Sequence, residues 1–286
     1  MSIQWFPGHM AKARRLITEN LKLIDVVVEL ADARVPEGSR NPMFTDLIGA
    51  KRRVLVLTKE DLAEPNLTKN WLNYYHKNGI SALALNSARP KKNSRKELLD
   101  HIRKEAQEIL EKRARKGIIN KTVRTMIVGI PNVGKSTLIN FVAGRGAAET
   151  GDRPGVTKGK QWIRLEGDIE LLDMPGILWP KIEDPELGRK LAVTGAISDR
   201  IFDPAELAVW LLEWLQISLP GRIKERYKIE EDGDGEALLT AISRKRGFLR
   251  AGGEPEREKG AIMLIDELRG GKLGPITLDR NIPTSP

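Results

Sequence analysis

The stretch TMIVGIPNVGKSTLINFVAG, residues 125–144, passes from an apolar run through a Gly-rich loop into a run with helical period. Its loop from Gly129 to Thr137 matches GxxxxGK[ST] between a predicted strand and a predicted helix, the context in which this pattern binds phosphate. Backbone N–H groups and the helix N-terminus then surround phosphate oxygens. Lys135 reaches the β- and γ-phosphates and acts in catalysis, and the Ser136 hydroxyl binds Mg2+. The residues predicted to surround the phosphates are Asn132, Val133, Gly134, Lys135, Ser136 and Thr137.

A second apolar run, IELL, ends in DMPG at Asp173–Gly176. A strand-end Asp downstream of a phosphate loop orients magnesium, and the N–H of Gly176 is placed to meet a γ-phosphate. Between these motifs, Thr157 lies in the basic loop RPGVTKGK and is a candidate to close over magnesium in catalysis, although an ordinary loop threonine is the alternative. The predicted magnesium ligands are Ser136, Thr157 and Asp173.

Two polar motifs, TKED at 58–61 and NSA at 86–88, follow apolar runs upstream of the phosphate loop. Guanine has two adjacent donors on its pairing edge, and a carboxylate accepts both, so Asp61 would select GTP over ATP. The Lys59 stem would lie along the base, and the Ala88 N–H would donate to the guanine carbonyl. A surface turn explains either motif alone, but both at successive strand ends favour a base site. The predicted base-side residues are Thr58, Lys59, Asp61, Asn86, Ser87 and Ala88.

Apolar runs and amphipathic stretches alternate up to Trp179, which predicts a mostly parallel sheet covered on both faces. Beyond Trp179, segments such as PAELAVWLLEWLQI have helical period and no convincing strand. We therefore predict an α/β GTPase domain over residues 1–180 and an all-helical domain over residues 181–286. The guanine motifs precede the phosphate loop, so the parts of a GTPase are present in rotated order.

The chain has 286 residues and a net charge of +9. It has no cysteine, which excludes disulfides and thiolate zinc sites, and its three histidines are too scattered for a metal cluster. It has no apolar run of membrane-spanning length and no secretion-like N-terminus, so we expect a cytoplasmic monomer without membrane contact. Residues 89–124 hold 13 Lys and Arg against five acidic residues, which is +8 of the total charge. This segment predicts either a polyanion-binding surface or a solvated helix face with i,i+4 ion pairs.

Several longer strings accompany these motifs: WFPGHMAKA at the start, DARVPEGSRNP from Asp32, and LAVTGAISD and GKLGPITLD in the tail. With them the sequence resembles the ribosome biogenesis GTPase A family of circularly permuted GTPases. The resemblance implies a circularly permuted P-loop GTPase domain with a helical C-terminal domain, which hydrolyses GTP to GDP with Mg2+. It also implies late assembly of the large ribosomal subunit and contact with its RNA. Thr58 departs from the family, which more often has Asn there, and this weakens a contact to the base ring.

The catalytic group is implied by the resemblance. Many GTPases follow DxxG with a Gln that orients water, but Ile177 occupies that position. The resemblance implies that His9 positions the water, after a turn at Pro7 and Gly8; a surface histidine at a helix start is the alternative. Asn132 resembles the Asn that holds K+ in potassium-dependent GTPases, with a loop-stabilising Asn as the alternative.

Two other functions remain open at this point: a GTP-dependent RNA-binding scaffold, and a permuted GTPase of the small subunit. Relatives of the latter kind resemble proteins with a Cys-rich zinc module, and the chain has no cysteine. In the tail, SRKRGFLRAGG predicts an RNA-binding patch or a solvated helix end. Its cations are Arg244, Lys245, Arg246 and Arg250, beside Phe248.

Overall fold

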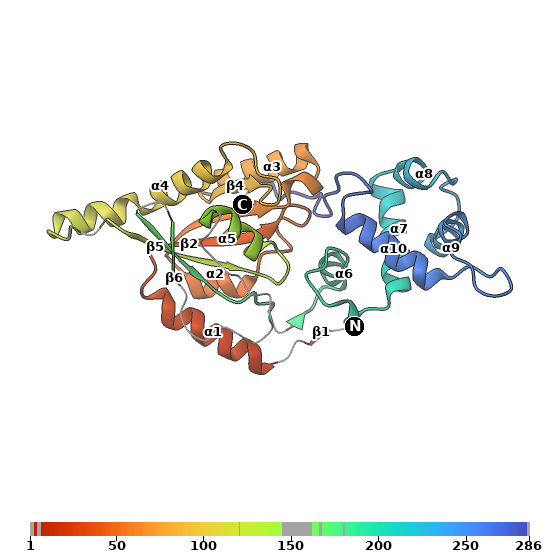
Figure 1. Ribbon diagram of the computed structural model, residues 1–286, viewed down its shortest axis with the longest axis horizontal. Coiled ribbons are helices and arrows are strands. Elements are labelled where there is room, and N and C mark those ends of the chain that lie inside the picture. The colour runs from red at the N-terminus through yellow and green to blue at the C-terminus, as the bar shows by residue number, and fades with distance from the viewer. Residues whose placement is uncertain are drawn as a thin grey trace. The chain divides into compact units, whose positions relative to one another are not determined.

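The computed structural model describes residues 3–4, 7–119, 121–144, 162–165, 168–179 and 181–284. Its contacts divide the chain into two compact units (Figure 1). One comprises Ser2–Ile182 together with Thr277–Pro286, and we call it the sheet unit. The other comprises Glu183–Ile276, and we call it the helical unit.

The sheet unit contains a six-stranded sheet in the order β4-β3-β2-β5-β7-β6. Each pair of neighbours is parallel except β6 and β7, which form an antiparallel pair. Its central strands are rich in Val, Leu and Ile, as is typical of a parallel sheet buried on both faces. The strands are β2 (Val26–Asp32), β3 (Arg52–Thr58), β4 (Ser81–Leu85), β5 (Val123–Gly129), β6 (Trp162–Leu165) and β7 (Ile169–Asp173).

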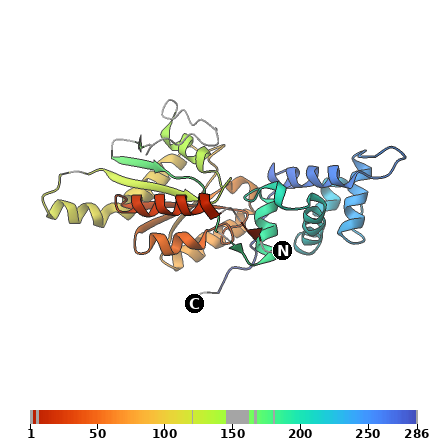
Figure 2. The ribbon, with the colours of Figure 1, turned by 90° about the horizontal axis from the view of Figure 1, so that it is seen from below.

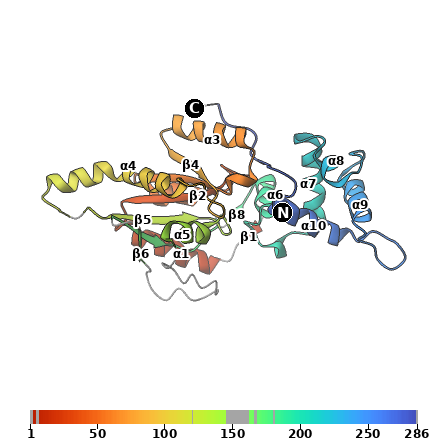
Figure 3. The same cartoon turned by 45° about the horizontal axis from the view of Figure 1, so that its top comes forward.

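Helices cover both faces of this sheet, with α3 and α4 on one side and α1 on the other (Figure 3). Ile17 of α1 and Phe44 of α2 pack in one buried cluster with Val27 and Met126 of the sheet. On the opposite face, Trp71 of α3 packs in a second cluster with sheet residues. The helices are α1 (Pro7–Leu21), α2 (Pro42–Ile48), α3 (Pro65–Lys77), α4 (Ser94–Arg115) and α5 (Lys135–Ala143).

The helical unit (Figure 2, cyan to blue) contains α6 (Pro185–Val193), α7 (Pro204–Ser218), α8 (Arg222–Tyr227), α9 (Gly235–Lys245) and α10 (Arg257–Arg269). Three of these helices begin after an Asp whose side chain accepts a backbone N–H of the first turn, which satisfies N-terminal donors. Those caps are Asp184, Asp203 and Asp234. Leucines of α7 at helical spacing form the centre of the unit, with α9 and α10 packed around them.

The structure differs from the sequence prediction at several boundaries. The sequence assigned residues 181–286 to the helical domain, but Thr277–Pro286 groups with the sheet unit because Thr277 and Leu278 are buried there. A two-residue strand β8 (Lys181–Ile182) pairs antiparallel with β1 (Ile3–Gln4). Strands this short have no readable period, and the sequence predicted neither.

Pro7 and Gly8 were predicted to form a turn before a helix, but they are the first residues of α1. Proline is accommodated there because its missing N–H has no partner in the first turn of a helix. Helices α2, α3 and α8 were not predicted from the sequence. No helix within the described ranges combines the length and apolarity that crossing a bilayer requires.

Candidate functional site

The sequence motifs lie together at the end of the sheet that is formed by the carboxyl ends of the parallel strands. Asp32 pairs with Thr58, and Thr58 with Leu85, so TKED and NSA begin at the ends of neighbouring strands. On the other side of β2, β5 ends at Gly129, and Asp173 pairs with its Ile127. The strand order reverses direction between β2 and β5, the kind of place where open α/β sheets bind ligands.

The phosphate loop has a backbone that requires its particular residues. Gly134, the residue before α5, has φ of +102°, which favours glycine. Asn132 has φ of +56°, a left-handed conformation that Asn tolerates better than most residues. This conformation supports the alternative that Asn132 stabilises the loop, and it leaves a role in K+ binding as a prediction.

The two charged groups of the phosphate side are in contact. Lys135 Nζ lies 2.5 Å from Asp173 Oδ1, and the Lys135 side chain is largely buried. Ser136 and Thr137 are exposed in the first turn of α5. A hydroxyl and a carboxylate beside this lysine are suitable ligands for Mg2+ and its waters. Binding of a magnesium nucleotide would exchange the ion pair for contacts to the metal and the phosphates.

The DMPG segment packs directly on the phosphate loop. A Cβ added to Gly176 would lie 3.2 Å from Pro131 Cα and 3.3 Å from Ile130 O, so only glycine fits without displacing backbone. The N–H of Ile177 donates to Gly129 O at 3.1 Å, and its side chain is buried in the core. Ile177 therefore has a packing role, consistent with the expectation that it does not orient water.

Asn41 holds this segment from the other side, and sequence reasoning missed it. Its Nδ2 donates to Ile177 O at 2.8 Å, and its Oδ1 accepts the Met43 N–H at the start of α2. An Asn before a Pro is a helix-start signal in the sequence, but its second contact joins residues 136 positions apart.

Thr58 and Lys59 connect the base side to the phosphate loop. The Thr58 hydroxyl is buried and lies within hydrogen-bonding distance of Val133 O and of Ala31 O. Lys59 Nζ donates to Asn132 O at 2.8 Å and to Asp32 Oδ2 at 2.9 Å. Thr58 thus positions the loop that surrounds phosphate, and its predicted contact to the nucleotide stays a prediction.

Asp32 anchors this cluster, and sequence reasoning did not assign it a role in the site. Its carboxylate accepts hydrogen bonds from Arg34 Nε at 2.9 Å and Nη2 at 2.7 Å, besides the bond from Lys59. Burial by itself raises the pKa of Asp32, but attraction to Arg34 and Lys59 and their hydrogen bonds hold that pKa well below its usual range. The DAR string in the sequence was the available signal, since it follows a strand.

Asp61 lies in a one-turn 3-10 helix, Glu60–Leu62, directly after Lys59. It is exposed at the same sheet edge, and no described residue bonds to its carboxylate. Asn86 Oδ1 accepts the N–H groups of Ala88 at 3.0 Å and Arg89 at 2.9 Å. The Ala88 N–H predicted to meet the base therefore has an internal partner, which a base carbonyl would have to replace.

Two predicted catalytic residues have no described side chain. His9 lies in the first turn of α1, and its side chain is outside the described part of the structure. Thr157 lies in residues 145–161, which are also outside the described part. Their roles stay predictions.

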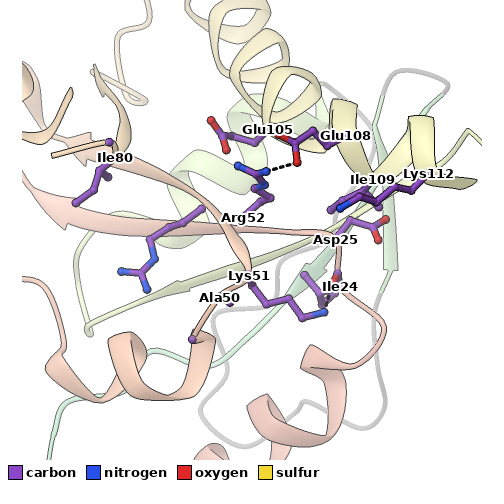
Figure 4. A pocket seen from close by; sticks show the side chains of 13 residues that line it. Ile24, Asp25, Ala50, Lys51, Arg52, Ile80, Glu105, Glu108, Ile109 and Lys112 are labelled. Atoms are coloured by element: carbon purple, nitrogen blue, oxygen red, sulfur yellow. Dashed lines mark hydrogen bonds and ion pairs between the residues drawn. The ribbon is translucent and has the colours of Figure 1, made fainter. Parts of the chain in front are cut away.

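A cavity of about 630 Å³ lies at the opposite end of the strands, near the amino ends of β2 and β3 (Figure 4). Several of its charged groups already have partners: Arg52 pairs with Glu108, and Lys51 Nζ donates to Ile24 O at 2.6 Å. It is separate from the nucleotide motifs, which lie at the carboxyl ends of the strands.

Comparison with known proteins agrees with this geometry. Residues 124–233 match the family model described as 50S ribosome-binding GTPase. Ribosome biogenesis GTPase A of Priestia megaterium is 48% identical over 98% of this chain and 97% of its own length. The protein of that name from Thermotoga maritima is 31% identical over 97% and 94% of the two chains.

Solved structures agree as well. The GDP-bound structure of TM YlqF has a TM-score of 0.71 and 27% identity, and the alignment covers 93% of this chain and 99% of that one. GNP-bound YlqF from T. maritima has a TM-score of 0.65 and 28% identity, and the alignment covers 94% of this chain and 98% of that one. The predicted fold class, a circularly permuted GTPase domain with a helical C-terminal part, is therefore confirmed, and the chain belongs to the ribosome biogenesis GTPase A family of GTPases.

Proposed function

We propose that this protein is a GTP-hydrolysing assembly factor for late maturation of the large ribosomal subunit, and that it binds ribosomal RNA in a GTP-dependent way. One observation carries the proposal: TKED, the phosphate loop and DMPG lie together at the carboxyl ends of the strands, where Lys59 contacts both Asp32 and Asn132. The names of its relatives support the ribosomal role. We place its action in the cytoplasm as a monomer.

In the proposed reaction, Asp61 accepts the two guanine donors and Lys59 covers the base. Lys135 and the backbone N–H groups of residues 132–137 hold the β- and γ-phosphates. Ser136 and Asp173 would hold Mg2+, which would supply positive charge against the phosphate oxygens. His9 would position the attacking water, an assignment that rests on the family resemblance. Thr157 would close over the metal side, an assignment that rests on its place in the basic loop RPGVTKGK.

The helical unit offers the first candidate RNA surface. Lys245 and Arg250 are exposed near Phe248, whose ring lies 5.3 Å from Lys259 Nζ. Arg246, predicted for the same patch, is instead paired with Glu267 at 3.4 Å and stacks over a tyrosine. We therefore propose Arg244, Lys245, Arg250 and Lys259 as the cations of this patch.

Helix α4 offers the second surface. It carries much of the basic 89–124 segment, and several of its charges form ion pairs, such as that of Arg103 with Asp168 at 2.9 Å. Because paired cations neutralise fewer phosphates, we rank this surface below the helical patch.

The order of the chain supports the proposed GTP dependence. Residues between Asp173 and β8 lead directly into the helical unit at Glu183. A γ-phosphate contact at Gly176 can therefore bias the segment that connects the two units, as in other switches ordered by GTP and released on hydrolysis.

Turnover with purified ribosomal subunits tests the proposal. We expect the large subunit, and not the small one, to raise the rate of GTP hydrolysis under multiple-turnover conditions. Tight GTP-dependent binding without faster hydrolysis would favour the scaffold function, because a passive scaffold has no reason to hydrolyse faster when docked. Stimulation by the small subunit alone would contradict the proposal.

A further inference from the structure

The chain leaves the helical unit at Ile276 and returns to the sheet unit as a segment without helix or strand, Thr277–Ile282, which we call the C-terminal strap. Thr277 and Leu278 are buried, with exposed fractions of 0% and 2%. Ile282 packs against the buried cluster that contains Trp71 of α3. Segments without helix or strand usually run over the surface, so a buried one with specific polar contacts requires a physical explanation.

On one side the strap holds Glu64, the residue immediately before α3. The Thr277 hydroxyl accepts the Glu64 N–H at 3.0 Å, and the Thr277 N–H donates to Glu64 Oε1 at 3.3 Å. Arg280 forms an ion pair with the same carboxylate. Glu64 lies three residues after Asp61, so the strap fixes the exit of the turn that carries the base-reading carboxylate.

On the other side the strap holds the loop that follows β2. The Leu278 N–H donates to Arg34 O at 2.7 Å. Asp279 Oδ2 accepts the N–H groups of Glu37 at 3.1 Å and Gly38 at 2.9 Å. The Trp71 indole donates to Asp279 O at 2.9 Å, which ties the strap to α3 as well.

The attachment at Arg34 continues into the site through side chains already described. Arg34, whose carbonyl the strap holds, forms the buried ion pair with Asp32 at 2.7 Å. Asp32 in turn holds Lys59, and Lys59 contacts the phosphate loop at Asn132. The strap is therefore connected through Arg34, Asp32 and Lys59 to the phosphate loop, and through Glu64 to the turn that carries Asp61.

Asp61 itself depends on its flanks. It lies in a single 3-10 turn between Thr58, which is fixed in β3, and Glu64, which the strap fixes. We propose that the C-terminal strap is a positioning element of the nucleotide site, which holds the Lys59–Glu64 turn so that the protein selects guanine. This proposal rests on the proposed role of Asp61 as guanine reader.

Inosine triphosphate (ITP) provides the probe, because its base lacks the 2-amino group that one carboxylate oxygen of Asp61 would accept. We would measure dissociation constants for GTP and ITP with the full chain, with a chain ending at Ile276, and with Asp279→Ala. The matched controls are a chain ending at Pro283, which keeps every strap contact described, and Asp279→Asn, whose amide oxygen still accepts N–H donors.

For the truncation and for Asp279→Ala we expect GTP affinity to fall by about fivefold or more, in the range of energetic couplings between separate parts of a protein. ITP affinity should fall less, so the preference for GTP over ITP should shrink. Both controls should keep most of the preference. A tail that only stabilised the fold would lower the active fraction of protein, and it would leave the ratio of the two constants unchanged.

An unchanged GTP to ITP ratio in Asp279→Ala, in protein that remains folded, would overturn the strap proposal. A full chain that binds ITP as tightly as GTP would instead overturn the guanine-reading role of Asp61. The two failures are therefore distinguishable. If the truncated chain does not fold, Asp279→Ala alone decides the question.

Discussion

Replacing Asp32 by Asn removes a buried carboxylate that pairs with both Arg34 and Lys59. The side chains of Asp32 and Arg34 are 5% and 3% exposed, so solvent cannot replace the lost charge. Breaking a buried pair by changing one partner costs about 3–5 kcal/mol, because an uncompensated charge stays buried. We therefore expect Asp32→Asn to lower the free energy of unfolding by about that amount.

The matched control is Asp168→Asn. Asp168 also pairs with an arginine, Arg103, but the two side chains are 41% and 36% exposed. An exposed pair is worth about 0–1 kcal/mol, so this variant should be close to wild type. Urea unfolding followed by circular dichroism measures both, with the two units of the chain fitted as separate transitions.

The difference in the free energy of unfolding between wild type and Asp32→Asn should depend on pH in a defined direction. The pKa of Asp32 is held below its usual range in the folded state, so its stabilisation is present above about pH 4, the ordinary Asp value, and is lost as pH falls towards the folded pKa. The gap between wild type and Asp32→Asn should therefore shrink below pH 4. A loss under about 1 kcal/mol at pH 7, or no larger than that of Asp168→Asn, would refute this reasoning.

Four further predictions concern the site and the RNA surface. Asp61→Asn should lose its preference for GTP over ATP in competition binding, since each mismatched buried hydrogen bond costs roughly 1–3 kcal/mol; an unchanged preference would show that TKED does not read guanine. Lys135→Ala should nearly abolish nucleotide binding, whereas His9→Ala should keep binding and slow single-turnover hydrolysis, and equal loss of binding in both would contradict this division. Gly176→Ala should lower affinity for GTP more than for GDP, because its methyl group would press on Pro131 at 3.2 Å where DMPG meets the phosphate loop, and an equal effect on both nucleotides would argue against γ-phosphate contact. Changing Lys245 and Arg250 together to Ala should reduce the salt dependence of binding to the large subunit by about two ions without altering hydrolysis by the free protein; an unaltered slope would leave α4 as the better candidate.

The sequence by itself determined the chemical inventory and the type of fold. GIPNVGKST, DMPG and TKED predict contacts to phosphate, magnesium and guanine, because each of these groups requires particular donors and acceptors. The alternation of apolar runs predicted β2, β3, β4 and β5, since strands buried on both faces are continuous in hydrophobicity. These features are local, so they can be read along the chain.

Only the tertiary structure decided which residues support those motifs. Asp32 contacts Lys59, Asn41 contacts Ile177, and the C-terminal strap contacts Glu64 across more than 200 positions of sequence. Nothing local marks such pairs, because an Asp after a strand or a Thr in a tail has many possible partners. The fold selects among them because it brings the carboxyl ends of the parallel strands together. Polar groups that become buried there need hydrogen-bond partners, and they find them in each other.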